Sequence, residues 1–161
     1  MAVLAFGLAM CFMFGADSAP CPSVTVVAQI TSKADVQALN DALACDGEGY
    51  FNITWYSSLT IEEGIKIFHK KNVIVTGAVS RVGGGLGNVN GAGIVIDVGG
   101  GTGIFAVSDG SILRLNNLVL QGGNAENGGA VDVRSSSSLF VFGCIFSNNN
   151  ASNGGETPQL G

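Results

Sequence analysis

Hydrophobic residues follow two different periods along the first half of the chain. In residues 33–44 four apolar side chains recur at helical spacing, namely Val36, Leu39, Ala42 and Leu43, and Asp46-Gly47 follows as a stop signal. We therefore expect one short amphipathic helix over 33–44. After it, short runs rich in β-branched and aromatic residues alternate with Gly, Ser, Asn or charged residues, and they predict strands at 51–55, 59–61, 65–68 and 73–76. Residues 77–93 contain seven Gly and few large side chains, which predicts a loop.

The last third of the chain contains an internal repeat. Residues 104–129 align with residues 130–155 at an offset of 26 without a gap, and eight positions are identical. Within the strand-like runs, alternate positions are apolar in both copies; the six pairs are Phe105/Val131, Val107/Val133, Leu113/Leu139, Leu115/Val141, Leu118/Cys144 and Leu120/Phe146. Because alternate side chains of a strand point the same way, one face of each copy is predicted to be buried.

A repeat of this length predicts a stacked solenoid. Three short strands with Gly and Asn at the corners, where tight turns demand a positive φ, fit one coil of a parallel β-helix. Coils of this kind stack about 4.8 Å apart and bury their inward faces together. A leucine-rich repeat is the alternative solenoid, but no L-x-x-L-x-L-x-x-N frame recurs. We predict an all-β fold, a right-handed parallel β-helix of about three to four coils with a short N-terminal capping helix.

Several segments also carry a resemblance to known proteins. The stretch from Ile94 to Asp97, the Gly run 99–103 and the segment GIFAVSDGSILRLNNLVLQGG resemble secreted right-handed β-helix proteins of the pectin-lyase-like class. The second copy, with Gly128-Gly129-Ala130-Val131 at its start and Phe146-Ser147-Asn148-Asn149 at its end, is similar to the repeats of polymorphic outer membrane proteins. The resemblance implies a β-helix fold over about residues 50–155. It leaves function open, because the class contains polysaccharide lyases, hydrolases and epimerases as well as adhesive surface proteins.

Composition and charge narrow the choice of partner. The chain has 161 residues, of which 25 are Gly, 47% are hydrophobic and only 12% are charged. This apolar content predicts a folded chain rather than a disordered one. The net charge of -5 has the wrong sign for a surface that binds nucleic acid through phosphates, so we expect no nucleic-acid partner.

The N-terminal residues predict export. Residues 2–16 are uncharged, mostly apolar and too short to span a bilayer, and small residues follow them, which is typical of a secretory signal peptide over 1–19. The positively charged start of such signals is missing, so an uncleaved anchor or a cytosolic protein with an apolar leader stays open. We predict three segments, a signal peptide at 1–19, an N-terminal cap with the helix at 20–49 and the β-helix at 50–161, which we expect to be incomplete at its C-terminus. The predicted location is extracellular or at the cell surface.

Cysteines and sequons give the candidate covalent sites. Cys21 and Cys45 bracket one segment near the mature N-terminus and are expected to form a disulfide, with two free, packed cysteines as the alternative. Cys144 is expected to point inward and to be unreactive. Asn52 and Asn150 stand in N-x-[ST] sequons and are candidate glycosylation sites, although Asn150 has Asn124 at the equivalent repeat position and serves equally well as a stacked corner residue. With a single His and no C-x-x-C pair, we expect no metal site and no cofactor.

Few residues are suited to catalysis. Hydrolysis of a polysaccharide needs two carboxylates across the bond, and the repeat offers four acidic residues, Asp97, Asp109, Glu126 and Asp132. Asp132 is predicted to face outward beside Ala106, without a stacked carboxylate, and the others fit turns or corners. Arg114 and Arg134 can neutralise a uronate but are more typical of solvated side chains, and His69 beside two Lys residues fits an exposed loop. We expect no catalytic residue.

The outward positions raise one more expectation. Val119, Phe140, Phe142 and Ile145 are apolar on the face predicted to meet solvent, which indicates a covering loop or a binding surface. We therefore predict a secreted or cell-surface protein with an adhesive, structural or surface-recognition role and no catalysis of its own. A polysaccharide-active enzyme (lyase, hydrolase or uronan epimerase) or a fragment of one, and a carbohydrate-binding module, are the alternatives. Extracellular polysaccharide or a cell-surface protein is the expected partner, together with end-to-end self-association if the last coil stays open.

Overall fold

The chain folds into a parallel β-solenoid of about four turns with one helix in the part that the structure describes. The structure is a computed structural model, and it describes residues 20–21, 25–78 and 93–153. Every strand pair in these residues is parallel. The predicted parallel β-helix is confirmed.

Each turn of the solenoid contributes short strands to successive walls. The stack begins with strand β1 (Val26–Ile30) and helix α1 (Lys33–Leu43). The first coil contains β2 (Gly49–Trp55), β3 (Leu59–Thr60) and β4 (Ile65–Ile67). The second contains β5 (Lys71–Gly77), β6 (Ile94–Asp97) and β7 (Phe105–Val107). The third contains β8 (Ile112–Asn116), β9 (Leu118–Gln121), β10 (Asn124–Ala125) and β11 (Val131–Val133), and the fourth contains β12 (Ser138–Phe142), β13 (Ile145–Ser147) and β14 (Asn150–Ala151).

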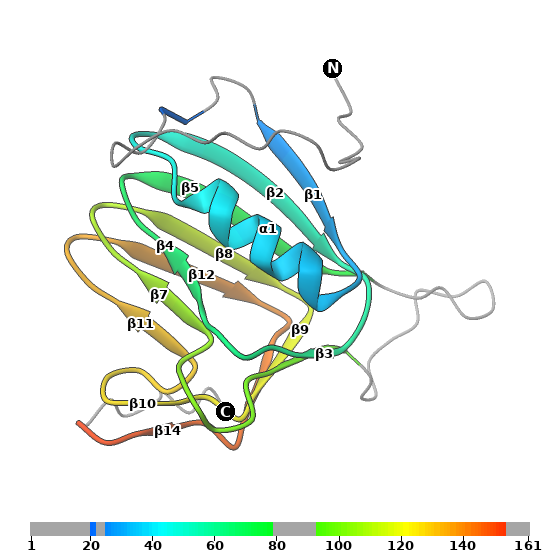
Figure 1. Cartoon of the computed structure of the whole chain (residues 1–161). Helices are drawn as coiled ribbons and strands as arrows, with labels where there is room; N and C mark the ends of the chain where they lie inside the picture. Colours follow the sequence, from blue (N-terminus) through cyan, green and yellow to red (C-terminus); the bar gives the residue numbers. More distant parts are fainter. Residues whose placement is uncertain (1–19, 22–24, 79–92, 154–161) are drawn as a thin grey trace.

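Equivalent strands of successive coils pair side by side to form the walls. The largest wall has the order β1-β2-β5-β8-β12, and Figure 1 shows these strands crossing the molecule from blue to orange. A second wall has the order β3-β6-β9-β13 and a third has β4-β7-β11, while β10 pairs with β14. The strand predictions at 51–55, 59–61, 65–68 and 73–76 are therefore confirmed, with boundaries that differ by one or two residues.

The repeat predicted from the sequence sets the register of the last coils. Val131 pairs with Phe105, Leu139 with Leu113 and Phe146 with Leu120, each across the predicted offset. The inward side chains of the earlier copy are almost completely buried, as expected: Phe105, Val107, Leu113, Leu115, Leu118 and Leu120. The core is thus a column of apolar side chains along the stack. Phe51, Ile53 and Trp55 of β2 extend it toward the N-terminal end.

Helix α1 closes the N-terminal end of the stack. Its N-cap Ser32 accepts a hydrogen bond from the backbone of Asp35, and the Asp35 carboxylate accepts one from the Ser32 backbone in return, so the two residues form a capping box. The helix packs against β1 and β4, each the first strand of its wall, and buries Val36, Leu39 and Leu43. The helix predicted at 33–44 is confirmed.

The main addition to the predicted fold is strand β1. It pairs with β2 from Val26↔Phe51 to Ile30↔Trp55, so the sheet extends into the segment expected to be a cap. The corners use the turn residues that the sequence offers, since Asp109 and Gly110 both have positive φ. The leader at 1–19, most of the loop at 77–93 and the end of the chain from 154 lie outside the described residues. No helix within the described ranges is long and apolar enough to cross a membrane.

Candidate functional site

The outward side of the five-stranded wall carries polar side chains on three neighbouring strands. We call it the outer face and define it by the outward side chains of β2, β5 and β8. They are Tyr50, Asn52, Thr54, Asn72, Ile74, Thr76, Ile112, Arg114 and Asn116. The register stacks them in rows, with Asn52 beside Ile74 and then Arg114, and Thr54 beside Thr76 and then Asn116.

Polar groups at the centre of the outer face hold one another in place. The Arg114 guanidinium donates from Nη1 to Oδ1 of Asn72 at 2.6 Å, and the Asn116 amide donates to Oγ1 of Thr76 at 3.4 Å. Arg114 is the single charged side chain of the outer face. It is half-buried and also lies 5.1 Å from the centre of the Phe140 ring, within the range of a cation–π contact. Arg114 is thus held by contacts with neighbouring coils, which supply an acceptor and an aromatic ring, and it is only partly exposed to solvent.

Aromatic side chains border this polar centre on two sides. Tyr50 of β2 is exposed at one corner, and Phe140 and Phe142 of β12 are exposed on the next coil beyond Arg114 and Asn116. Phe140 and Phe142 thus point outward, as expected from the sequence. No described segment covers Phe142, which is 73% exposed. The surface combines amide and hydroxyl groups, one guanidinium and flat apolar rings on a rigid sheet. Such a surface suits a polyhydroxylated partner that needs both hydrogen bonds and apolar contact.

The structure separates the four acidic residues of the repeat among corners and strands. Asp97 accepts hydrogen bonds from the Gly99 backbone at 2.8 Å and the Gln121 amide at 3.3 Å, as expected of a corner residue. Asp109 occupies a turn with φ of 59°, and Glu126 accepts from Asn153 at 2.7 Å.

Asp132 faces outward next to Ala106, in the predicted register. Its carboxylate forms an ion pair with Arg134 at 2.6 Å, and Arg134 itself stays largely exposed. The carboxylate is thus partnered by a local cation rather than by a second acid, and the four acidic residues contact different neighbours. Among the residues that the structure describes, no three His, Cys, Asp or Glu side chains gather at one point.

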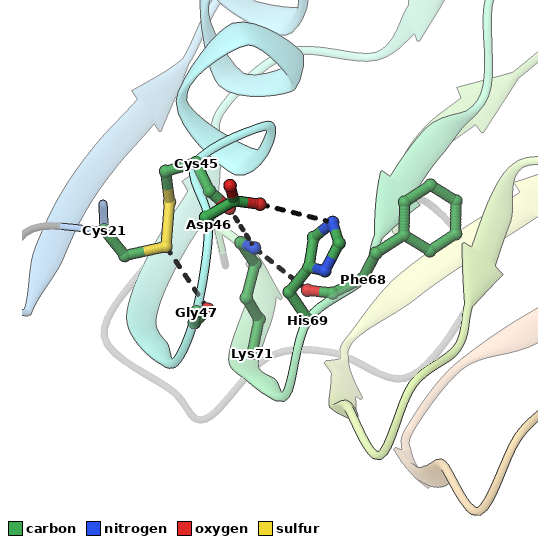
Figure 2. Close-up of polar contacts among 7 residues, drawn as sticks. All are labelled: Cys21, Cys45, Asp46, Gly47, Phe68, His69 and Lys71. Carbon is green, nitrogen blue, oxygen red and sulfur yellow. Dashed lines mark hydrogen bonds and ion pairs between the residues drawn. A yellow bond between two sulfur atoms is a disulfide. The ribbon is translucent and has the colours of Figure 1, made fainter. Parts of the chain in front are cut away.

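A second polar cluster lies at the N-terminal corner of the solenoid (Figure 2). Cys21 and Cys45 are joined by a disulfide, which ties the start of the described chain to the end of α1. The dashed line from Cys21 to Gly47 in Figure 2 is a packing contact of 3.4 Å, because a disulfide sulfur has no hydrogen to donate. The backbone N–H of Cys21 donates to the carbonyl oxygen of Asp46 at 2.9 Å, so this segment is held by covalent and backbone contacts together.

Lys71 is the unexpected member of this cluster. It is fully buried, and its ammonium donates to the carbonyl oxygens of Cys45 at 2.7 Å and Phe68 at 2.9 Å, as Figure 2 shows. Burial lowers the pKa of Lys71, and the nearby Asp46 carboxylate partly offsets that effect. Lys71 therefore stabilises the N-terminal corner by binding two backbone carbonyl groups in the interior, and it is inaccessible to a ligand.

His69 lies at the exposed corner between β4 and β5, with a positive φ of 61°. Its Nε2 is 3.8 Å from Oδ1 of Asp46, and both side chains are about half exposed. This is the exposed position expected from the sequence. The imidazole and the Asp46 carboxylate meet at the rim of the cluster around the disulfide, away from the outer face.

The two sequon asparagines occupy different settings. Asn52 is exposed on β2, the first strand of the outer face, on the same side of the strand as Thr54. Asn150 donates from its amide to Oδ1 of Asn124 at 3.2 Å, and Asn124 donates to the carbonyl oxygen of Gly100 at 3.0 Å. Asn150 is thus part of a stacked row of corner asparagines, and Asn52 is the sequon with an unengaged position on a flat surface.

Cys144 follows the predicted inward direction but is only partly covered. It packs against the core, half-buried, in the coil where the inward side chains are more exposed than in the coil before. Burial is the main influence on its thiol and raises the pKa of Cys144.

The architecture makes this chain a parallel β-solenoid protein. Comparison with models of known protein families, with curated proteins and with solved structures finds no match for it. The outer face and the contacts described above are therefore the basis for any statement about its function.

Proposed function

We propose that the protein is a secreted or cell-surface β-helix with an adhesive or surface-recognition role, and that its outer face binds extracellular polysaccharide. The observation that carries this proposal is the repetition of amide and hydroxyl side chains over three successive coils, with Arg114 as the single charge. Strands about 4.8 Å apart place Thr54, Thr76 and Asn116 at regular steps across three coils. A polymer with repeating hydroxyl groups can use such steps, whereas a compact ligand would need a pocket.

Two further features support a polysaccharide partner. Tyr50 and Phe140 at the borders of the outer face offer flat apolar surfaces, which match the C–H faces of sugar rings. The polar centre is preorganised, because Arg114 and Asn116 are already oriented by Asn72 and Thr76. A preorganised surface loses less conformational freedom when it binds. The export that this role requires is supported by the apolar leader at 1–19.

The proposal is tested by binding of the purified full chain to a panel of immobilised neutral and acidic polysaccharides. We expect saturable binding to at least one of them and a roughly tenfold to hundredfold loss for Arg114→Gln, because hydrogen bonds to a charged group contribute about 1.5–3 kcal/mol. Arg134→Gln is the matched control, since Arg134 is an exposed arginine away from the outer face. It should bind as well as the unmodified chain.

Four outcomes would count against the proposal. Failure to bind any polysaccharide, or equal losses for Arg114→Gln and Arg134→Gln, would remove the outer face from recognition. Capture of a cell-surface protein without any polysaccharide would replace the partner by a protein. Release of shortened or unsaturated oligosaccharides would support the alternative, a polysaccharide lyase, hydrolase or epimerase.

A further inference from the structure

Asn52 stands on the outer face between apolar side chains. Its register partners are Val27 on β1 and Ile74 on β5, and Tyr50 precedes it by two residues on the same side of β2. Val27 is 44% exposed and Tyr50 is 57% exposed. Val27 and Ile74 carry no group that can form a hydrogen bond with the Asn52 amide. The exposed amide therefore lies within a partly exposed apolar patch.

The sequon around Asn52 presents both of its required side chains on one face. Asn52 and Thr54 point outward, while Ile53 between them is fully buried. N-linked glycans are bulky and need a surface asparagine in an N-x-[ST] sequence. A glycan on Asn52 therefore extends away from the sheet and displaces no side chain of the core.

The sequon at Asn150 has a different setting. The Asn150 amide donates to Oδ1 of Asn124 at 3.2 Å, and the Asn150 backbone N–H donates to the carbonyl oxygen of Gly123 at 2.7 Å. Asn150 thus contributes its amide to a row of stacked corner residues. The register partners of Asn52 offer it no such hydrogen bond.

Tyr50 lies where it can contact a sugar attached to Asn52. Residues two apart on a strand are about 6.6 Å apart and point the same way, so the Tyr50 ring stands beside the attachment atom, Nδ2 of Asn52. The ring offers a flat apolar face and a polar hydroxyl group at its end, which suits the C–H face of a sugar ring. Contact with the first sugar buries the exposed ring of Tyr50 and covers Val27 and Ile74 beside it.

We propose that Asn52 carries an N-linked glycan and that Tyr50 packs against the first sugar of that glycan. The oligosaccharide comes from a lipid-linked pyrophosphate donor and is transferred before the strand folds. The bond from C1 of the first sugar to Nδ2 of Asn52 forms as the bond from C1 to the pyrophosphate oxygen breaks, and one amide proton leaves to a base of the transferring enzyme. Tyr50 is a positioning residue in the folded product and takes no part in the transfer.

This inference rests on the export that the proposed function includes. The glycan occupies the β2 margin of the outer face and takes up the ring of Tyr50. Arg114 lies two strands away, about 9.6 Å across the sheet, so the polar centre formed by β5 and β8 stays open to a polysaccharide.

The first test is peptide mapping of the full chain after expression in cultured animal cells, with its own leader and with residues 1–19 replaced by an established signal peptide. We expect secreted protein in which the peptide containing Asn52 carries a glycan. Thr54→Ala should lose that glycan, and the matched variant Thr54→Ser should keep it, because serine also completes the sequon. An unmodified Asn52 in the secreted protein, or a glycan that survives Thr54→Ala, would overturn the inference. Export only with the replaced leader would count against the proposed function instead.

The second test measures the contact between Tyr50 and the first sugar. Tyr50→Ala is made in the glycosylated chain and in Asn52→Gln, and urea unfolding is followed for all four proteins. The loss in the folding equilibrium constant should be roughly twofold to tenfold larger in the glycosylated chain, the range of an aromatic stacking contact. Trimming the glycan to its first sugar with an endoglycosidase should preserve this difference.

Tyr56→Ala is the matched control. Tyr56 is an exposed tyrosine four residues from Asn52, about 13 Å along an extended chain, and its loss should be the same with and without the glycan. Equal losses for Tyr50→Ala in the two backgrounds, or a difference that disappears when only the first sugar remains, would overturn the proposed contact.

Discussion

Truncating one leucine in each copy of the repeat tests how packing is distributed along the stack. Leu113 and Leu139 are register partners in β8 and β12 with the same inward direction. Leu113 is fully buried between coils, so Leu113→Ala loses transfer free energy and leaves a cavity, at a cost of about 2–5 kcal/mol. Leu139 is only partly buried, so Leu139→Ala should cost about 1 kcal/mol. This is about half of the transfer free energy of a fully buried leucine side chain, with no added cost for a cavity.

Urea unfolding measures both costs. The single tryptophan, Trp55, is fully buried in β2 and reports on the first coil through its fluorescence, while far-UV circular dichroism reports on all strands. Both variants should be measured at several protein concentrations, so that any contribution of association to the measured stability is seen as a concentration-dependent midpoint. Each coil of a solenoid contacts only its neighbouring coils, so a change in the fourth coil has little effect on the first. Leu139→Ala should therefore move the circular-dichroism transition more than the Trp55 transition.

Two results would refute this reasoning. Equal destabilisation by Leu113→Ala and Leu139→Ala would mean that the fourth coil is covered as well as the third. A cost below about 1 kcal/mol for Leu113→Ala would mean that the inward column is loosely packed. Either result would contradict the burial that the structure gives to Leu113 and Leu139.

Three further outcomes follow from the covalent and titratable groups. Replacing both Cys21 and Cys45 by Ser should lower the free energy of unfolding by roughly 3.5 kcal/mol, the chain-entropy value for a loop of this length, and an unchanged urea midpoint would show that the disulfide contributes nothing. The backbone N–H of Thr31 is the main cause that lowers the pKa of Asp35, so the stability it contributes is present above the unfolded pKa and is lost as pH falls through the folded one. Asp35→Asn should therefore flatten the acid side of the stability profile, and an unaltered profile would contradict this assignment. Cys144 should react with an alkylating reagent much more slowly than an unfolded thiol at neutral pH, which peptide mass mapping checks, and equal rates would show that it faces solvent.

The repeated half of the fold was predictable because two coils have the same length. The two copies share a spacing of 26 residues, so the alternating apolar positions of one copy can be aligned with those of the other. This alignment predicted the inward direction of Leu113 and Leu139 and their pairing, which the structure confirms. The earlier coils differ in length, since Asn52 pairs with Ile74 after 22 residues and Ile74 pairs with Arg114 after 40. No single period aligns them, so the rows of the outer face could not be read from the sequence.

Strand β1 and the buried Lys71 were missed for different reasons. Ala28 and Ile30 already alternate toward the core, but the run lies between an apolar leader and a helix and has no repeat partner to reveal its pairing. Lys71 shares the inward parity of Val73 and Val75, a signal that the sequence does contain. Its acceptors are carbonyl groups of Cys45 and Phe68, which only the three-dimensional path of the chain brings within reach.

The most direct test of the proposed role is the position of a bound oligosaccharide on the folded chain. Backbone amide shifts of the labelled protein should be followed by NMR while a soluble fragment of the best-binding polysaccharide is added. The account predicts saturable shifts on β2, β5 and β8, centred on Asn72, Thr76, Arg114 and Asn116, with the inward residues of the same strands much less affected. Shifts confined to the N-terminal corner around His69 or to strands β12 and β13, with the outer face unchanged, would contradict it.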